Sequence, residues 1–228
     1  MILAHHSIIS FHGFWLPNDP RGSGSDYIAN WELFRYGPAT KVDTRHSVAH
    51  KSHDRANRLQ AKETLKTPPV LITGVQAVTV AAGFAKAIEE AGYGVHACAI
   101  LPDHVHLVIS WHERDIRVIV GHLRSKATMA LRKAGLWDDR QLWGEHGWNV
   151  RLEDIAEVER AIAYAEFNPE KEGKRRQQWS LVTQFVLDAV VARIRSQANG
   201  AKRERRIGGA ALRSHQQKLR RDGHGKGR

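Results

Sequence analysis

Cysteine and long apolar runs are both nearly absent from this chain. Cys98 is the single cysteine among 228 residues, which excludes an internal disulfide framework and suits a reducing compartment. The longest apolar-rich run, residues 77–85, is far too short to span a bilayer. Residues 1–10 lack the basic stretch and long apolar core of a secretory signal peptide. We therefore expect a cytoplasmic protein with no membrane partner.

Acidic residues are scarce at the C-terminal end. Residues 193–228 hold 12 Lys or Arg against Glu204 and Asp222, and because the formal net charge is +11, residues 1–192 sum to only +1. A polycationic, Gly-rich segment with few large apolar residues is typical of a disordered tail that binds a polyanion. We predict a folded domain over 1–198 and a disordered basic tail over 199–228. Nucleic acid is the favoured partner, which would place the protein at the nucleoid; a solubilising tail without a partner is the alternative.

Apolar periodicity and turn residues predict the order of the secondary structure. The expected elements are a strand within 6–16, a polar insertion or loop region over 22–69 with a short helix within 55–65, a helix over about 75–91, two hairpin strands over 94–101 and 104–111, a helix over about 115–134, a strand within 143–152, a helix over 154–168 and a last helix over about 181–196. This order is typical of an α+β, ferredoxin-like sandwich, in which an antiparallel sheet is covered by helices on one face.

His104-Val105-His106 opens the second strand of the predicted hairpin. Side chains alternate across a strand, so both imidazoles point to one face while Val105 points to the other. Two imidazoles placed in this way can hold one metal ion. The pattern alone is weak, because a chain with 14 His in 228 residues contains about one His-x-His triplet by chance. Its position in a sheet, directly after the Pro102-Asp103 turn, favours the metal site.

Tyr164 stands on the helix predicted over 154–168. At about 100° per residue it faces away from the middle of the helix's apolar stripe, and Asn168 lies on its face one turn later. A phenol, with an ordinary pKa of about 10, attacks phosphorus when a metal polarises the phosphate and a neighbour takes the proton. The amide oxygen of Asn168 is a ligand that suits Mg²⁺ or Mn²⁺. The structural alternative is a tyrosine packed at a helix edge.

Three motifs together resemble a known family. They are His12-Gly13-Phe14-Trp15-Leu16-Pro17-Asn18-Asp19-Pro20-Arg21-Gly22, the strand LPDHVHLVIS around His104, and Tyr164-Ala165-Glu166-Phe167-Asn168-Pro169. In this order they resemble the GTWLPGDPRG, LPDHxHLL and YIxxNPV motifs of the REP-associated tyrosine transposases and related insertion-sequence transposases, which are single-tyrosine HUH enzymes. Two residues depart from the pattern, since Glu166 stands where many members have His and Glu170 where Val is common.

The resemblance implies a ferredoxin-like fold and a defined chemistry. It implies that His104, His106 and Asn168 hold a divalent metal, Mg²⁺ or Mn²⁺, and that Tyr164 is the nucleophile. Tyr164 would form a 5′-phosphotyrosine and release a 3′-hydroxyl on single-stranded DNA that bears hairpin or repeat sequences. Members of the family usually act as dimers, so a homodimer is expected. Whether Glu166 contacts the metal stays open.

Basic residues of the folded part are candidates for contacting the DNA backbone. Arg124 and Lys126 lie on the helix predicted over 115–134, and Lys171, Lys174, Arg175 and Arg176 follow Tyr164 directly. The second group is the better candidate because it would lie beside the nucleophile. Solvated surface charge is the alternative for both groups.

Two other functions fit the same residues. One is a domesticated HUH nuclease that acts in replication or mobilisation, with the same chemistry. The other is a non-catalytic, ferredoxin-like protein that binds single-stranded nucleic acid through its basic tail. The last would show neither metal dependence nor a covalent adduct with DNA.

Overall fold

A computed structural model describes residues 1–42, 48, 51–145, 147–188, 191–192 and 196. The chain divides into one compact unit, Met1–Phe185, and a second unit, Val186–Arg228. The predicted tail over 199–228 lies outside the described residues, so the tail and its boundary at residue 198 stay predictions. No helix among the described residues is long and apolar enough to cross a membrane.

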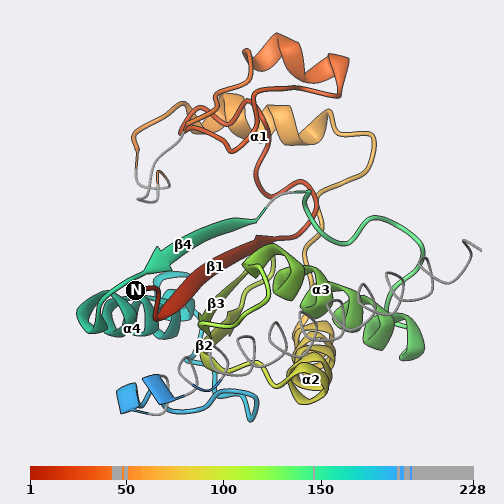
Figure 1. Ribbon diagram of the computed structural model, residues 1–228. Helices are drawn as coiled ribbons and strands as arrows, with labels where there is room; N and C mark the ends of the chain where they lie inside the picture. Colours follow the sequence, from red (N-terminus) through yellow and green to blue (C-terminus); the bar gives the residue numbers. More distant parts are fainter. Residues whose placement is uncertain (43–47, 49–50, 146, 189–190, 193–195, 197–228) are drawn as a thin grey trace, which may run out of the picture. The chain divides into compact units, whose positions relative to one another are not determined.

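The first unit is built on one antiparallel sheet (Figure 1). Its strands are β1 (Ala4–Ser10), β2 (Val95–Ile100), β3 (His104–Ser110) and β4 (Trp148–Leu152), in the spatial order β2-β3-β1-β4. Every neighbouring pair is antiparallel. The β2–β3 hairpin turns at Pro102-Asp103, as predicted, and Leu101 N–H donates to the His104 carbonyl at 2.8 Å. With its helices this is the ferredoxin-like α+β fold expected from the sequence.

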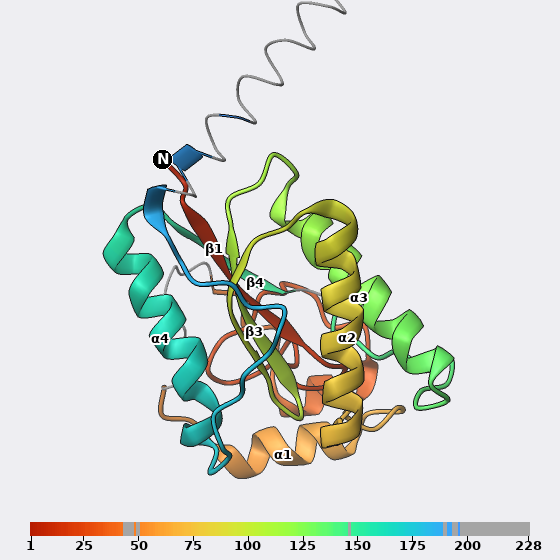
Figure 2. The ribbon, with the colours of Figure 1, turned by 90° about the horizontal axis from the view of Figure 1, so that it is seen from below.

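The helices cover both faces of this sheet. Figure 2 shows α2 (Gly74–Ala91) and α3 (Ile116–Lys133) on one side and α4 (Ile155–Lys171) on the other. Val105, Leu107 and Ile109 join the core formed with α2 and α3, whereas the histidines of β3 point toward α4. The expected placement of the helices on one face is therefore corrected for α4. The reason is that all seven residues of β3 are buried, so the sheet has two faces to cover.

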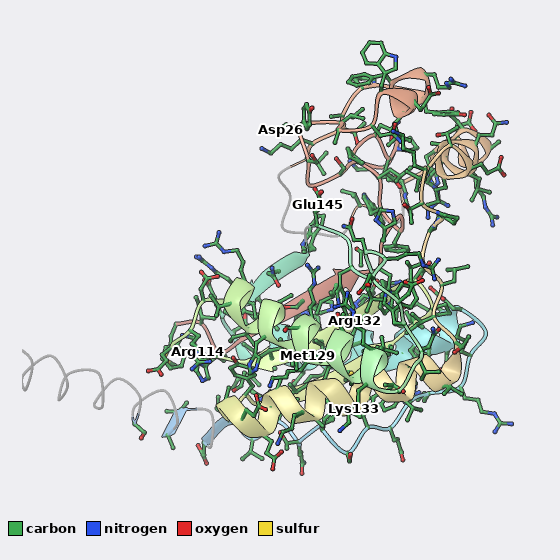
Figure 3. All side chains as sticks on the ribbon, turned by 90° about the vertical axis from the view of Figure 1, so that its right-hand side faces the viewer. Asp26, Arg114, Met129, Arg132, Lys133 and Glu145 are labelled. Carbon is green, nitrogen blue, oxygen red and sulfur yellow. The ribbon has the colours of Figure 1, made fainter. Side chains whose placement is uncertain are left out.

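Helices α2 and α3 cross closely. A Cβ added at Gly83 of α2 would lie 2.4 Å from Cα of Ala127 on α3, so only glycine permits this approach. Figure 3 shows the two helices side by side, with Met129 and Arg132 on the exposed side of α3. The start of α2 is fixed by a capping box between Thr73 and Gln76.

Helix α4 runs farther than expected. It ends at Lys171 and contains Pro169, whereas the proline predicted an end near Asn168. Proline's fixed φ is itself helical, and at this position only one backbone hydrogen bond is lost in the last turn. The carbonyl of Pro169 then accepts from the N–H groups of Glu172 at 3.1 Å and Lys174 at 2.9 Å, which close the helix end.

The helix expected over 181–196 is wrong in its first part, whereas the described residues 187–188, 191–192 and 196 are helical. Residues 181–186 are not helical, and Thr183 N–H donates to the Val95 carbonyl at 2.8 Å. The side chain of Gln177 bonds both the N–H and the carbonyl of Ile100, each at 2.7 Å. This segment satisfies the outer edge of β2, which is an edge strand, and that need outweighs the helical spacing of its apolar residues.

The polar region between β1 and α2 has structure of its own. It contains a 3-10 helix, η1 (Trp31–Tyr36), and α1 (Arg55–Glu63), as expected for a short helix within 55–65. Its small separate core is formed by Leu16, Ile28, Leu33 and Ala61. The strand expected within 6–16 ends at Ser10 instead, and Phe11 makes only an isolated bridge. Val70 N–H donates to the His12 carbonyl at 2.8 Å, where the region returns to the sheet.

Candidate active site

Three histidines and an aspartate form a chain of polar contacts on the α4 side of the sheet. The Nδ1–H of His104 donates to Oδ1 of Asp103 at 2.7 Å. Its Nε2 lies 3.0 Å from Nε2 of His106. Nδ1 of His106 in turn lies 3.1 Å from Nε2 of His6, on β1. The predicted pair on β3 is thus brought together, and His6 extends it.

Tyr164 lies against this cluster. Its ring centroid is 5.5 Å from that of His106 and 5.8 Å from that of His6, both in edge-on geometry. The tyrosine is 37% exposed. Nζ of Lys171, two turns along α4, lies 4.0 Å from the centroid of the same ring. These contacts place Tyr164 beside the histidines; its role as nucleophile, against the alternative of a tyrosine packed at a helix edge, stays a prediction.

Asn168 occupies the turn after Tyr164 and is buried, at 6% exposure. No hydrogen bond joins its side chain to another residue within the described part of the chain. The structure places Asn168 on α4, one turn from Tyr164, as the spacing predicted, and its role as a metal ligand stays a prediction.

Burial sets the charge of the site. It lowers the pKa of His6 to about 4. Burial, followed by the neighbouring His104, His6 and Lys171, lowers the pKa of His106 well below its ordinary value. Both rings are therefore neutral at pH 7, the form in which an imidazole binds a metal.

The paired imidazoles fit a divalent ion. An octahedral ion with bonds of about 2.1 Å holds neighbouring ligands about 3.0 Å apart, and this is the separation of the two Nε2 atoms of His104 and His106. The hydrogen bond to Asp103 keeps a proton of His104 on Nδ1, so the lone pair of Nε2 is available to a metal ion. Asp103, His104 and Glu172 also offer one ligand atom each within 4.8 Å of one another, which is a second arrangement around the same histidine.

The predicted DNA-binding residues separate into two groups. Lys171, Lys174, Arg175 and Arg176 lie at or beyond the end of α4, and Arg176 pairs with Glu170 at 2.8 Å. Arg124 and Lys126 lie on α3, on the other side of the sheet. Lys126 Nζ is 2.7 Å from a Glu90 oxygen, and burial lowers the pKa of Arg124 to about 10. The structure brings Lys171 to the tyrosine and does not bring Arg124 or Lys126 there.

Three neighbours of the site were not identified from the sequence. His6 stands in a β-favouring stretch, and the order of a ferredoxin-like sheet, which places β1 beside β3, was the signal that could have identified it. Asp103 was read only as a turn residue. Phe14, whose ring stacks on His104 at 4.7 Å between centroids, belongs to a motif with no assigned contact.

Comparison with known proteins bears on this geometry. Residues 69–153 match the family described as IS200-like transposases. Among solved structures, a REP-associated tyrosine transposase bound to a REP hairpin is similar over 81% of this chain and 93% of its own, at 8% identity and a TM-score of 0.43. A candidate transposase from Deinococcus radiodurans R1 is similar over 78% of this chain and 94% of its own, at 12% identity and a TM-score of 0.37. No curated protein matches the sequence.

The matched segment contains both histidines of β3 and ends before Tyr164. The paired imidazoles therefore lie inside the family pattern, and the tyrosine is placed beside them by α4. Residues 69–153 carry the sequence pattern of the IS200-like transposases, which confirms the resemblance for the motif around His104. The motifs at 12–22 and 164–169 lie outside the matched residues, and their resemblance stays a prediction.

Proposed function

We propose that this protein is a transposase-type endonuclease that cuts and rejoins single-stranded DNA through Tyr164. The observation that carries the proposal is the contact of the Tyr164 ring with His106, whose Nε2 faces that of His104 at 3.0 Å. A phenol, two buried imidazoles and the ammonium of Lys171 meet there. Strands bearing hairpins or repeats are the proposed substrate, because the motif resemblance implies them.

The cleavage step exchanges one phosphate ester for another. The phenol oxygen of Tyr164 attacks the scissile phosphorus, and the bond from phosphorus to the 3′-oxygen breaks. The phenolic proton passes to solvent, and the leaving oxygen takes one to become a 3′-hydroxyl. The product is a 5′-phosphotyrosine. Rejoining reverses the step, since a 3′-hydroxyl attacks the same phosphorus and releases the tyrosine.

The residues around Tyr164 have separate roles in this proposal. His104, His106 and Asn168 would hold a divalent ion, Mg²⁺ or Mn²⁺, which when bound polarises the scissile phosphate. We favour this set over the arrangement with Glu172, because Asp103 already accepts the Nδ1 proton of His104. The ammonium of Lys171 stabilises negative charge that develops near the phenol.

The surface beyond Tyr164 suits the sugar-phosphate backbone and an unpaired base. Phe167 is 44% exposed, with Lys171 Nζ at 5.7 Å and the Arg176 guanidinium at 5.9 Å from its ring centroid. An exposed ring beside cations can stack on a base of a single strand. Lys174 and Arg175 would extend this surface. We further propose that the protein acts as a homodimer in the cytoplasm, at the nucleoid.

The proposal is tested with Tyr164→Phe, which keeps the ring and its packing but removes the nucleophilic oxygen. Wild-type protein, Mn²⁺ and single-stranded hairpin oligonucleotides should give a protein–DNA adduct that survives boiling in detergent. The variant should bind the same DNA and form no adduct. Mass spectrometry should place the nucleotide on Tyr164. Binding without any cleavage by the wild type would instead support a non-catalytic single-strand-binding protein.

A further inference from the structure

One face of α1 carries cations that the proposed chemistry leaves unused. Arg55, Arg58 and Lys62 are spaced by three and four residues, so they share one side of the helix. Residues 41–66 hold seven Lys or Arg against three Asp or Glu, although residues 1–192 as a whole sum to only +1. Residues 41–66 therefore carry a net positive charge, whereas the rest of residues 1–192 carries a small net negative charge.

This face lies beside the histidines. The ring of Phe14 stacks on His104, with centroids 4.7 Å apart and planes 14° apart. Nζ of Lys62 is 5.3 Å from the centroid of the same Phe14 ring. One aromatic side chain thus separates the ammonium of Lys62 from the imidazole of His104.

The positive charge on this face is not neutralised by the carboxylates near it. Asp19 and Asp103 are the acidic residues whose fields act on Arg58 and Lys62. Asp19 already binds Arg21 at 2.7 Å, and Asp103 already accepts from His104 at 2.7 Å. Nε of Arg58 is buried and has no hydrogen-bond partner among the residues that the structure describes.

Partial burial of Arg58 and Lys62 also favours the binding of an anion. It is the largest cause lowering the pKa of both Arg58 and Lys62. Half-buried cations that lack a carboxylate of their own are stabilised when a phosphate enters, because the phosphate restores the interactions lost with water.

We propose that Arg58 and Lys62 form a phosphate-binding subsite that holds the single strand next to the scissile bond, on the His104 side of the site. That the phosphates belong to single-stranded DNA rests on the proposed function. Lys171 on α4 and Arg176 beyond its end would hold the strand beside Tyr164, so the strand would be bound at two places, one near α1 and one near the end of α4. Arg55, at the exposed start of α1, contributes through its charge alone.

The test measures binding separately from cleavage. In a Tyr164→Phe background, Arg58→Gln, Lys62→Gln and the double variant are titrated with a labelled single-stranded hairpin oligonucleotide over a range of salt. Each lost phosphate contact should lower the slope of log affinity against log salt by about 0.7, so the double variant should lose about 1.4. Lys86→Gln, an exposed lysine on α2, removes the same charge and is the matched control.

A methylphosphonate scan then locates the contact. One phosphate at a time is made neutral along the oligonucleotide. The parent protein should lose affinity at one or two positions adjacent to the cleaved bond, and the double variant should be insensitive at those positions alone. Thermal melts confirm that the variants fold.

Two outcomes overturn the proposal: a double variant with the slope of the Lys86→Gln control, or a scan that the double variant leaves unchanged. Neither depends on the enzyme assignment. If wild-type protein cleaves while the slopes do not change, the subsite is wrong and the endonuclease stands. If the slopes change and the wild type never cleaves, the subsite stands and the endonuclease is wrong.

Discussion

Nε2 of His6 lies 3.1 Å from Nδ1 of His106, at the ring atom that does not face His104. A ligand histidine is commonly oriented by a hydrogen bond to its second nitrogen. When Nδ1 of His106 donates to His6, Nε2 of His106 keeps a lone pair directed at His104. We therefore expect His6 to orient His106 in the proposed metal site and not to act as a third ligand.

His6→Phe should weaken Mn²⁺ binding about 10- to 100-fold, since it keeps a ring of similar size but removes the acceptor. His6→Gln should recover part of the affinity. Mn²⁺ electron paramagnetic resonance measures the free ion directly and needs no DNA. His5 points to the opposite face of the sheet, so His5→Gln is the control. Unchanged Mn²⁺ affinity in His6→Phe would exclude the positioning role.

Glu166 and Asn168 should behave differently. Glu166 lines a surface depression together with Glu159, Thr183 and Phe185, whereas Asn168 is buried one turn from Tyr164. We expect Asn168→Ala to abolish adduct formation and Glu166→Ala to change its rate by less than a few-fold. Adduct formation in single-turnover conditions measures both. An equal loss in the two variants would mean that Glu166 completes the metal shell.

Lys171→Met should slow adduct formation more than it weakens DNA binding. The ammonium is 4.0 Å from the centroid of the Tyr164 ring, where it favours negative charge developing in the transition state. Removal of one such electrostatic contact costs on the order of 100-fold in rate. Lys174→Met, on the same basic segment but past the end of α4, is the control. A role limited to DNA affinity would instead give the two variants equal rates at saturating DNA.

Gly83→Ala should destabilise the fold by about 1–3 kcal/mol, because a methyl group would overlap the backbone of Ala127 and push α2 away from α3. Gly121 is also inside a helix but has open space around it. Gly121→Ala should therefore stabilise the protein by about 0.5–1 kcal/mol. Urea unfolding of both variants gives the two free energies. An unchanged or increased free energy of unfolding in Gly83→Ala would show that the helix crossing tolerates the extra methyl group.

Much of the fold could be predicted from local patterns. The β2–β3 hairpin and the helices α2 and α3 follow from apolar periodicity, turn residues and helix caps, and their bounds agree closely with the sequence. The placement of α4 could not be predicted in this way, because a helix with one apolar stripe fits either face of a sheet. The end of α4 predicted from Pro169 was wrong for a related reason. Proline usually disfavours helical geometry in the residue before it, but the packing of α4 on the sheet overrides that preference.

The site was predictable only where it lies in consecutive residues. His104 and His106 share a strand, and Tyr164 and Asn168 share a helix, so spacing relates the members of each pair. His6 is 100 positions from His106, and their contact depends on the pairing of β1 with β3, in which Ile8 lies opposite His106. Contacts across strands distant in sequence leave no local periodicity to detect.

The backbone hydrogen bond between Val70 and His12 has a consequence for how such chains can vary. This hydrogen bond closes the 57-residue segment from Gly13 to Pro69 at its base, so the segment begins and ends at the same point of the fold. The entropic cost of closing a loop rises only slowly with its length, so residues can be added or removed there without shifting β1 against β3. The segment between β1 and α2 can therefore differ in length from one relative to another, while the distances among His6, His104 and His106 stay fixed.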